Sequence, residues 1–98
     1  MAFKYELIIT PEAYDDFEDA YNYVRFVLRN EVAAKKLLKK SLEAINHARD
    51  FPTSNPIYKE WRKAIVGNYL IFYEIDEDGK TIIVHSVYNS KMDYQKYI

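Results

Sequence analysis

The sequence predicts an α+β domain in which one strand and two helices precede three strands joined by tight turns. Helical periodicity fills residues 11–50, whereas strand-like alternation is confined to residues 3–9 and 61–88. A chain of 98 residues, 49% of them hydrophobic, fits one compact domain over residues 1–98. The order β-α-α-β-β-β indicates a three-stranded antiparallel meander, and an antiparallel sheet whose one face is covered by an antiparallel helix hairpin.

The first strand and helix are marked by a change in periodicity. Residues 3–9, FKYELII, mostly alternate between apolar and polar side chains, as in a strand with one buried face. Thr10 then suits a helix N-cap, and Pro11 suits the first helical turn because its missing N–H needs no partner there. We therefore expect the first helix to begin at Pro11.

Two amphipathic helices are predicted over residues 11–29 and 31–50. Each has an apolar stripe at helical spacing, and the lysines of the second helix face away from its stripe. Asn30 alone separates them, so the helices should form an antiparallel hairpin. The stripes comprise Ala13, Phe17, Ala20 and Val24 in the first helix, and Ala34, Leu37, Leu38, Ser41, Leu42, Ile45 and Ala48 in the second.

The second half of the chain predicts the meander. The prolines of FPTSNP end the second helix and open a loop over residues 51–56. Strands are expected at 61–66, 69–75 and 81–88, with hairpin turns at Gly67-Asn68 and at DEDGK, residues 76–80. The tail, residues 91–98, is expected as a short helix or an extended arm. The expected sheet core is Val66, Tyr69, Ile71, Phe72, Ile75, Ile82, Val84 and Val87.

Composition and charge exclude several classes of function. The net charge of −1 gives no general attraction to nucleic acid, and the absence of cysteine excludes disulfides and Cys-ligated metals. No long apolar run suggests a signal peptide or membrane span, which favours a cytoplasmic protein without a membrane partner. The chain has no P-loop, nucleophile-elbow, zinc-protease or dinucleotide motif, and we expect neither metal nor cofactor.

A basic group is the first candidate for substrate contact. It could bind phosphates, although ordinary surface charge is the simpler interpretation. Arg62 and Lys63 are consecutive in a strand and should point to opposite faces, so they cannot both line one site. The group comprises Lys59, Arg62, Lys63 and Lys91.

Polar and aromatic residues at the end of the last strand are the second candidate. A tyrosine could stack on a base and a lysine could stabilise developing charge. His85 precedes Tyr88 by three residues, so alternation predicts that the two lie on opposite faces and that His85 is a sheet-surface residue. The group comprises His85, Tyr88, Asn89, Ser90, Lys91, Asp93 and Tyr94.

Two charged segments have structural explanations. The acidic residues between Glu12 and Asp19 have the spacing of a helix end that faces water, and nothing in the spacing makes them converge on a metal. The lysine-rich second helix could bind a membrane or nucleic acid, but its apolar stripe is needed for the core. We therefore interpret it as an amphipathic core helix.

The ordered segments resemble the RelE/ParE superfamily of toxins from type II toxin–antitoxin modules, which includes plasmid stabilisation proteins. "TPEAYDDFEDAYNYV" and "AAKKLLKKSLEAINHARDFP" resemble the two helices of that superfamily. "WRKAIVGNYLIFYEID" resembles its hairpin, and "VHSVYNSKMDYQKYI" its last strand and tail. The resemblance covers nearly the whole chain and implies a RelE/ParE-like fold and a small toxin neutralised by a cognate antitoxin.

The resemblance also implies site residues. RNA-cleaving members often carry arginine where this chain has Leu70, and a histidine and two arginines where it has Asn89, Lys91 and Met92. Lys91 would then contact phosphate, Asn89 would form hydrogen bonds, and Tyr94 or Tyr88 would stack on a base. The implied substrate-binding residues are Arg62, Lys63, Tyr88 and Ser90.

Three functions follow from the resemblance. The leading hypothesis is a RelE-type, metal-independent endoribonuclease that cuts mRNA on the ribosome and so inhibits translation. The first alternative is ParE-like inhibition of DNA gyrase by binding, without catalysis. The second alternative is a non-toxic member that only binds its antitoxin. Each leaves open a homodimer or a hetero-oligomer with the antitoxin.

Overall fold

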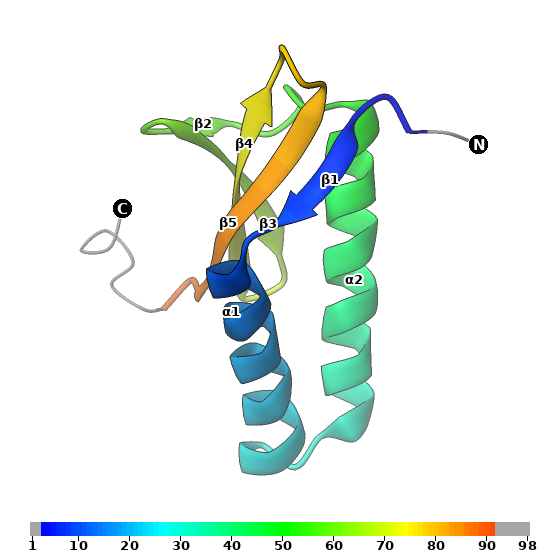
Figure 1. Cartoon of the computed structure of the whole chain (residues 1–98). Coiled ribbons are helices and arrows are strands. Elements are labelled where there is room, and N and C mark those ends of the chain that lie inside the picture. Colours follow the sequence, from blue (N-terminus) through cyan, green and yellow to red (C-terminus); the bar gives the residue numbers. More distant parts are fainter. Residues whose placement is uncertain (1–2, 92–98) are drawn as a thin grey trace.

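A mixed sheet and a helix hairpin form the fold in the computed structural model, which describes residues 3–91 (Figure 1). The expected order of elements is confirmed, with one further short strand, β2, in the segment after the second helix. The elements are β1 (Glu6–Ile9), α1 (Pro11–Asn22), the π-helical turn η1 (Tyr23–Val27), α2 (Glu31–Asp50), β2 (Ile57–Tyr58), β3 (Trp61–Val66), β4 (Tyr69–Asp76) and β5 (Thr81–Asn89).

The five strands form one sheet in the order β1-β5-β4-β3-β2. The meander of β3, β4 and β5 is antiparallel, as the turns predicted. β1 instead pairs parallel with β5, from Glu6 opposite Thr81 to Ile9 opposite Val84. The sheet is therefore mixed, whereas the sequence predicted an antiparallel one. The alternation of β1 specifies its buried face but not its neighbour, so the parallel edge could not be foreseen.

Thr10 joins the start of α1 to the sheet, and the expected N-cap is confirmed. Its hydroxyl accepts a hydrogen bond from the Ala13 N–H at 3.1 Å and donates one to the carbonyl of His85 at 3.2 Å. Its backbone N–H donates to the carbonyl of Val84 at 3.1 Å. Helix α1 therefore begins against the edge of β5, just beyond the last pair made by β1.

The first helix does not stay α-helical to Arg29, as the sequence predicted. It widens to a π-helical turn over Tyr23–Val27, where the Leu28 N–H donates to the Tyr23 carbonyl at 3.0 Å. Arg29 then adopts a left-handed φ of 53°, and the Asn30 side chain caps α2 through the Ala33 N–H. None of the helices within residues 3–91 is long and apolar enough to cross a bilayer.

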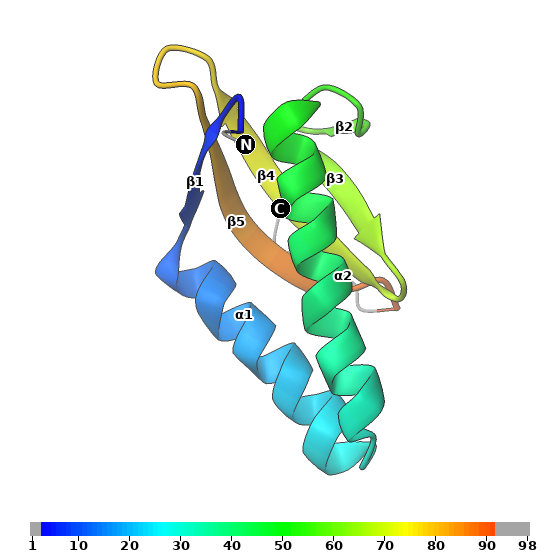
Figure 2. The ribbon, with the colours of Figure 1, turned by 90° about the vertical axis from the view of Figure 1, so that its right-hand side faces the viewer.

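The main core lies between the helices and one face of the sheet (Figure 2). Of the predicted core residues, Val66, Ile71, Ile82, Val84 and Val87 lie in the main cluster, and Tyr69 and Ile75 are partly buried against it. Phe72 is also fully buried, as predicted, but lies outside the cluster between the rings of Tyr58 and Tyr88. From the helices, Ala13, Ile45 and Ala48 enter the core, whereas Leu38 and Leu42 of the predicted stripe stay largely exposed. The cluster comprises Ala13, Ile45, Ala48, Ala64, Val66, Ile71, Tyr73, Ile82, Val84 and Val87.

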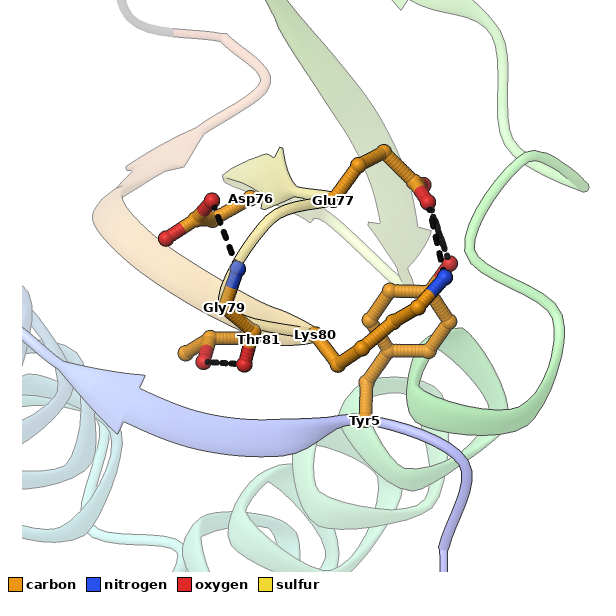
Figure 3. Close-up of polar contacts among 6 residues, drawn as sticks. All are labelled: Tyr5, Asp76, Glu77, Gly79, Lys80 and Thr81. Carbon is orange, nitrogen blue, oxygen red and sulfur yellow. Dashed lines mark hydrogen bonds and ion pairs between the residues drawn. The ribbon is translucent and has the colours of Figure 1, made fainter.

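The β4–β5 turn is fastened to the start of β1 by polar contacts (Figure 3). The Tyr5 hydroxyl donates to the Glu77 carboxylate at 2.9 Å, and Lys80 forms an ion pair with the same group at 3.2 Å. These hydrogen bonds, first that from Tyr5, lower the pKa of Glu77. Within the turn, the Gly79 N–H donates to Asp76 at 3.1 Å. The contacts fix the end of the sheet that lies away from the helix hairpin's connection.

Candidate functional site

The candidate site lies where the last part of β5 passes the first turns of α1. The Val87 N–H donates a hydrogen bond of 2.9 Å to Asp16 Oδ2, which joins helix and strand where β1 has ended. Two hollows of about 410 and 360 Å³ flank this contact, and Asp16 and Tyr88 line both. The Trp61 hollow is lined by Thr10, Glu12, Asp16, Trp61, His85, Ser86 and Tyr88; the Asn89 hollow is lined by Asp16, Asp19, Ala20, Tyr23, Tyr69, Val87, Tyr88 and Asn89.

A β-bulge places His85 in the Trp61 hollow. Phe72 pairs with Ser86 but Tyr73 pairs with Val84, so no residue of β4 lies opposite His85. The expectation that His85 and Tyr88 lie on opposite faces is wrong, because the bulge breaks the alternation and both residues line the same hollow. A shift in register of this kind leaves no mark in the apolar pattern of β5.

The His85 ring is held on two sides. Its Nε2 lies 2.8 Å from Glu74 Oε1, and its plane stacks on the Trp61 indole with ring centroids 4.4 Å apart and 12° between the planes. The two rings are stacked face to face and are called the aromatic wall here. His85 covers one face of the Trp61 indole, so only the opposite face can pack against another planar group, such as a base or a guanidinium.

The helix side of the site is acidic. Burial raises the pKa of Asp16; the hydrogen bond from Val87 opposes this, and the nearby carboxylates of Asp19, Asp15 and Glu12 add to the increase. Within residues 3–91, no group of three or more His, Asp or Glu side chains could hold a metal ion. Of the acidic residues that the sequence assigned to a water-facing helix end, Glu12, Asp16 and Asp19 form the helix wall of the site, whereas Asp15 and Glu18 are exposed and line neither hollow.

The residues predicted at the end of β5 stay together there, but one is already engaged. Asn89 Oδ1 accepts a hydrogen bond from the Lys91 N–H at 2.9 Å, and the Ser90 N–H donates to the Asn68 carbonyl at 2.7 Å. Tyr88 is half-buried, with its ring centroid 6.0 Å from that of Phe72. Ser90 and Lys91 are exposed. Tyr94, Met92 and Asp93 lie outside the described residues.

Leu70 occupies the position for which the sequence resemblance implied an arginine. It is only 5% exposed, and the register places it between Ile65 of β3 and Tyr88 of β5. Leu70 is therefore part of the packing beneath the candidate site. It offers no group that could bind a phosphate.

The structure does not bring Arg62 to the end of β5. Arg62 Nη1 donates to the carbonyl of Asn55 at 2.9 Å, and the neighbouring Tyr73 hydroxyl donates to that of Pro52 at 2.8 Å. Arg62 thus braces the loop at residues 51–56. Lys63 lies across Phe72 from Ser86 in the register, with its Nζ 5.4 Å from the Tyr58 ring centroid.

Sequence reasoning missed several residues of the site. The sequence predicts Trp61, the only tryptophan in the chain, simply as a strand residue, and it gives no signal for Glu74 or Ser86. A lone tryptophan beside an exposed sheet face could have drawn attention. Ser86 could not have been found, because its place depends on the bulge.

Comparison with known proteins gives one family and one fold. A sequence model described as "ParE toxin of type II toxin-antitoxin system, parDE" matches residues 7–94. No curated protein matches the chain.

Three solved structures share the fold at low sequence identity. A chain of the chromosomal ParDE system from P. aeruginosa has a TM-score of 0.72 at 15% identity, covering 90% of this chain and 98% of its own. The RelBE2 toxin–antitoxin complex from Mycobacterium tuberculosis has a TM-score of 0.58 at 14% identity, covering 88% of this chain and 98% of its own. An E. coli RelE mutant in complex with an antitoxin RelB peptide has a TM-score of 0.55 at 15% identity, covering 97% of this chain and 95% of its own.

Proposed function

Because the chain belongs to the ParE toxin family of type II toxin–antitoxin systems, we propose that it is a toxin that acts by binding its target without cleaving it. The proposed target is DNA gyrase, which ParE-like members of the superfamily inhibit. The single observation that carries this proposal is the state of two positions, Leu70 and Asn89.

Those two positions are occupied in a way that does not suit RNA cleavage. Leu70 is buried in the packing of the sheet, where RNA-cleaving relatives often place an arginine. Asn89 replaces a histidine, and its side-chain oxygen already accepts a hydrogen bond from the Lys91 backbone. A neutral amide cannot act as a general base. Inhibition by binding requires neither group.

RNA cleavage is the second candidate, and one feature favours it. Tyr88, Ser90 and Lys91 lie together at the end of β5, and Lys91 is exposed. A lysine can stabilise charge on a phosphate, and a tyrosine can stack on a base. In this case the chain would be a metal-independent endoribonuclease that inhibits translation on the ribosome, with Tyr94 as a further contributor.

A cognate antitoxin is the proposed partner in both cases. The RelBE2 and RelE structures that share the fold are complexes with antitoxins. In this chain, many large apolar side chains of the helix hairpin remain exposed, as expected of a surface that a partner covers. They are Tyr14, Tyr23, Phe26, Val27, Leu28, Val32, Leu38 and Leu42.

Inducible expression in a bacterial host without the antitoxin tests the proposal. We expect DNA synthesis to stop before protein synthesis, with filamentous cells and induction of the SOS response. The Lys91→Ala variant should stay as toxic as the exposed-lysine control Lys39→Ala, because no catalytic step uses Lys91.

An early stop in translation that Lys91→Ala relieves, with the folded protein still present, would favour RNA cleavage instead. Normal growth with soluble, folded protein would contradict both candidates. The pulse-labelling of DNA and protein in the same culture separates these results.

A further inference from the structure

The Trp61 hollow has a negative lining that the proposed function leaves unexplained. Glu12 and Asp16 form its helix side, and Asp16 also faces the adjoining Asn89 hollow with Asp19. No lysine or arginine is among the described residues that line either hollow. The surface therefore attracts a cation and repels a phosphate backbone.

Asp16 is a carboxylate that a cation would stabilise. Its pKa is raised mainly by burial, and three neighbouring carboxylates raise it further. Its Oδ2 accepts only the Val87 N–H among the hydrogen bonds of the described residues, so the carboxylate retains capacity to accept more.

Ser86 is an independent sign that the hollow is a binding site. Its side chain is only 7% exposed, and its Oγ is buried without a hydrogen-bond partner among residues 3–91. A buried hydroxyl without a partner costs free energy and is uncommon in folded proteins. Ser86 lines the same hollow as Asp16, so a donor that enters the hollow meets both residues. The Ser86 Oγ itself has almost no accessible surface, so its hydroxyl must turn towards the hollow to accept a hydrogen bond.

The aromatic wall narrows the choice of cation. The Trp61 indole, stacked on the His85 ring, lies in the hollow with Asp16 and Ser86. A guanidinium is planar, packs well on tryptophan, and carries five N–H donors that can reach a carboxylate and a hydroxyl at once. An ammonium group matches the charge but not the flat wall.

We propose that the Trp61 hollow receives an arginine side chain of the partner protein. The arginine would pair with Asp16 and Glu12, pack on Trp61 and donate to Ser86. This inference rests on the proposed antitoxin as the source of the arginine. It gives that partner a defined chemistry, namely a basic segment that enters between α1 and β5.

An NMR titration of the full chain tests the hollow without the partner. The probe is Nα-acetyl-arginine amide, with the neutral citrulline analogue as its matched control. We expect saturable shifts of the single indole N–H of Trp61 and of the Ser86 and Val87 amides with the arginine compound only.

Variants show whether the charge acts through this hollow. Asp16→Asn keeps an oxygen for the Val87 N–H and should weaken binding about tenfold. Asp15→Asn, on the same helix but outside the hollow, should leave binding within about twofold. Equal effects of the two variants, or scattered shifts that do not saturate, would overturn the proposal.

A nucleotide titration addresses the competing ligand. If GMP, but not the arginine compound, shifts the same resonances to saturation, the hollow is a base-binding site and the arginine proposal fails. These titrations do not depend on toxicity. A non-toxic chain that still binds the arginine compound would contradict the proposed function while leaving the hollow's chemistry intact.

The complex itself gives the last comparison. With the purified antitoxin, Asp16→Asn should raise the Kd about tenfold relative to Asp15→Asn. Equal Kd values for both variants would show that the antitoxin places no arginine in the hollow.

Discussion

At the scale of single residues, Asp16 has two roles that oppose each other. Its carboxylate accepts the Val87 N–H and so joins α1 to β5. The same carboxylate is partly buried beside other acids, which raises its pKa. When the pKa of a carboxyl group is higher in the folded state than in the unfolded state, the free energy of unfolding falls as the pH rises through the folded-state pKa. The folded protein then holds a poorly solvated charge.

We therefore expect Asp16→Asn to raise the melting temperature near neutral pH. The amide keeps an acceptor for Val87 and removes the charge. The gain should be largest above the raised pKa and should disappear below the ordinary aspartate value of 3.8, where Asp16 is protonated in both states. Thermal unfolding followed by circular dichroism, once near neutral pH and once below pH 3.8, measures the change in melting temperature.

The exposed neighbour Asp15 provides the control. Asp15→Asn should change the melting temperature less at neutral pH, since its side chain is exposed and accepts no backbone N–H among the described hydrogen bonds. A gain for Asp16→Asn that increases towards low pH would contradict the assignment.

The sequence could predict which residues gather at the end of β5, but not which contacts their side chains make. The sequence predicted Tyr88, Asn89, Ser90 and Lys91 as neighbours, because consecutive residues of one strand must be. It could not show that Asn89 closes a turn, since that depends on the backbone beyond the strand. Arg62 was assigned to substrate, but the loop it braces comes close only after folding.

At the scale of elements, the backbone is left-handed at Gly67 and at three residues with side chains, Arg29, Lys59 and Lys80, and two of these turns make a useful contrast. Gly67 has a φ of 57° at the first position of the two-residue β3–β4 turn, as in a type II′ turn. Arg29 has a φ of 53° between η1 and α2, where a side chain is unfavourable. One turn thus has the suitable residue and the other does not.

The two turns should respond oppositely to substitution. Gly67→Ala should lower the free energy of unfolding by about 1 kcal/mol, because alanine is strained in the left-handed backbone conformation. Its new Cβ would meet nothing within 4 Å, so backbone strain is the only cost. Arg29→Gly should raise it by about 0.5 kcal/mol, since relieved strain of about 1–2 kcal/mol exceeds the entropic cost of glycine. Urea unfolding at constant m-value measures both. Stabilisation by Gly67→Ala would show that the turn tolerates a different geometry.

The long elements could be predicted and the short irregular ones could not. Apolar periodicity and the Thr10 cap located both helices, and alternation located β3, β4 and β5. η1 has the same side-chain types as an α-helix, and only its hydrogen bonds distinguish it. The two-residue strand β2 is too short to show a pattern.

At the scale of the whole molecule, the parallel pairing of β1 with β5 joins segments that are far apart in the chain. β5 lies between β1 and β4, so it has a neighbour on each side although it comes last among the strands of residues 3–91. The Thr10 contact with His85 spans 75 positions. Sequence patterns predicted the helix-covered sheet but not the pairing of β1 with β5, because long-range packing decides the partner of an edge strand.

A substitution at Leu7 tests whether the β1–β5 pairing unfolds together with the core. It lies opposite Ile82 in β5 and packs against the main cluster. We expect Leu7→Ala to lower the free energy of unfolding by about 2 kcal/mol, with circular dichroism and Trp61 fluorescence changing together. Ile8→Ala, on the exposed side of β1, should cost less than half as much. Separate transitions for the two probes would show that β1 detaches on its own.

The position of β5 also determines when the sheet described here can form during synthesis. Until the ribosome has made β5, β1 has no strand beside it and the core lacks Ile82, Val84 and Val87. Both hollows likewise lack one wall before that point. A nascent chain halted in the β3–β4 hairpin therefore lacks both the β1–β5 pairing and the candidate site. The candidate site can therefore form only after β5 has been made.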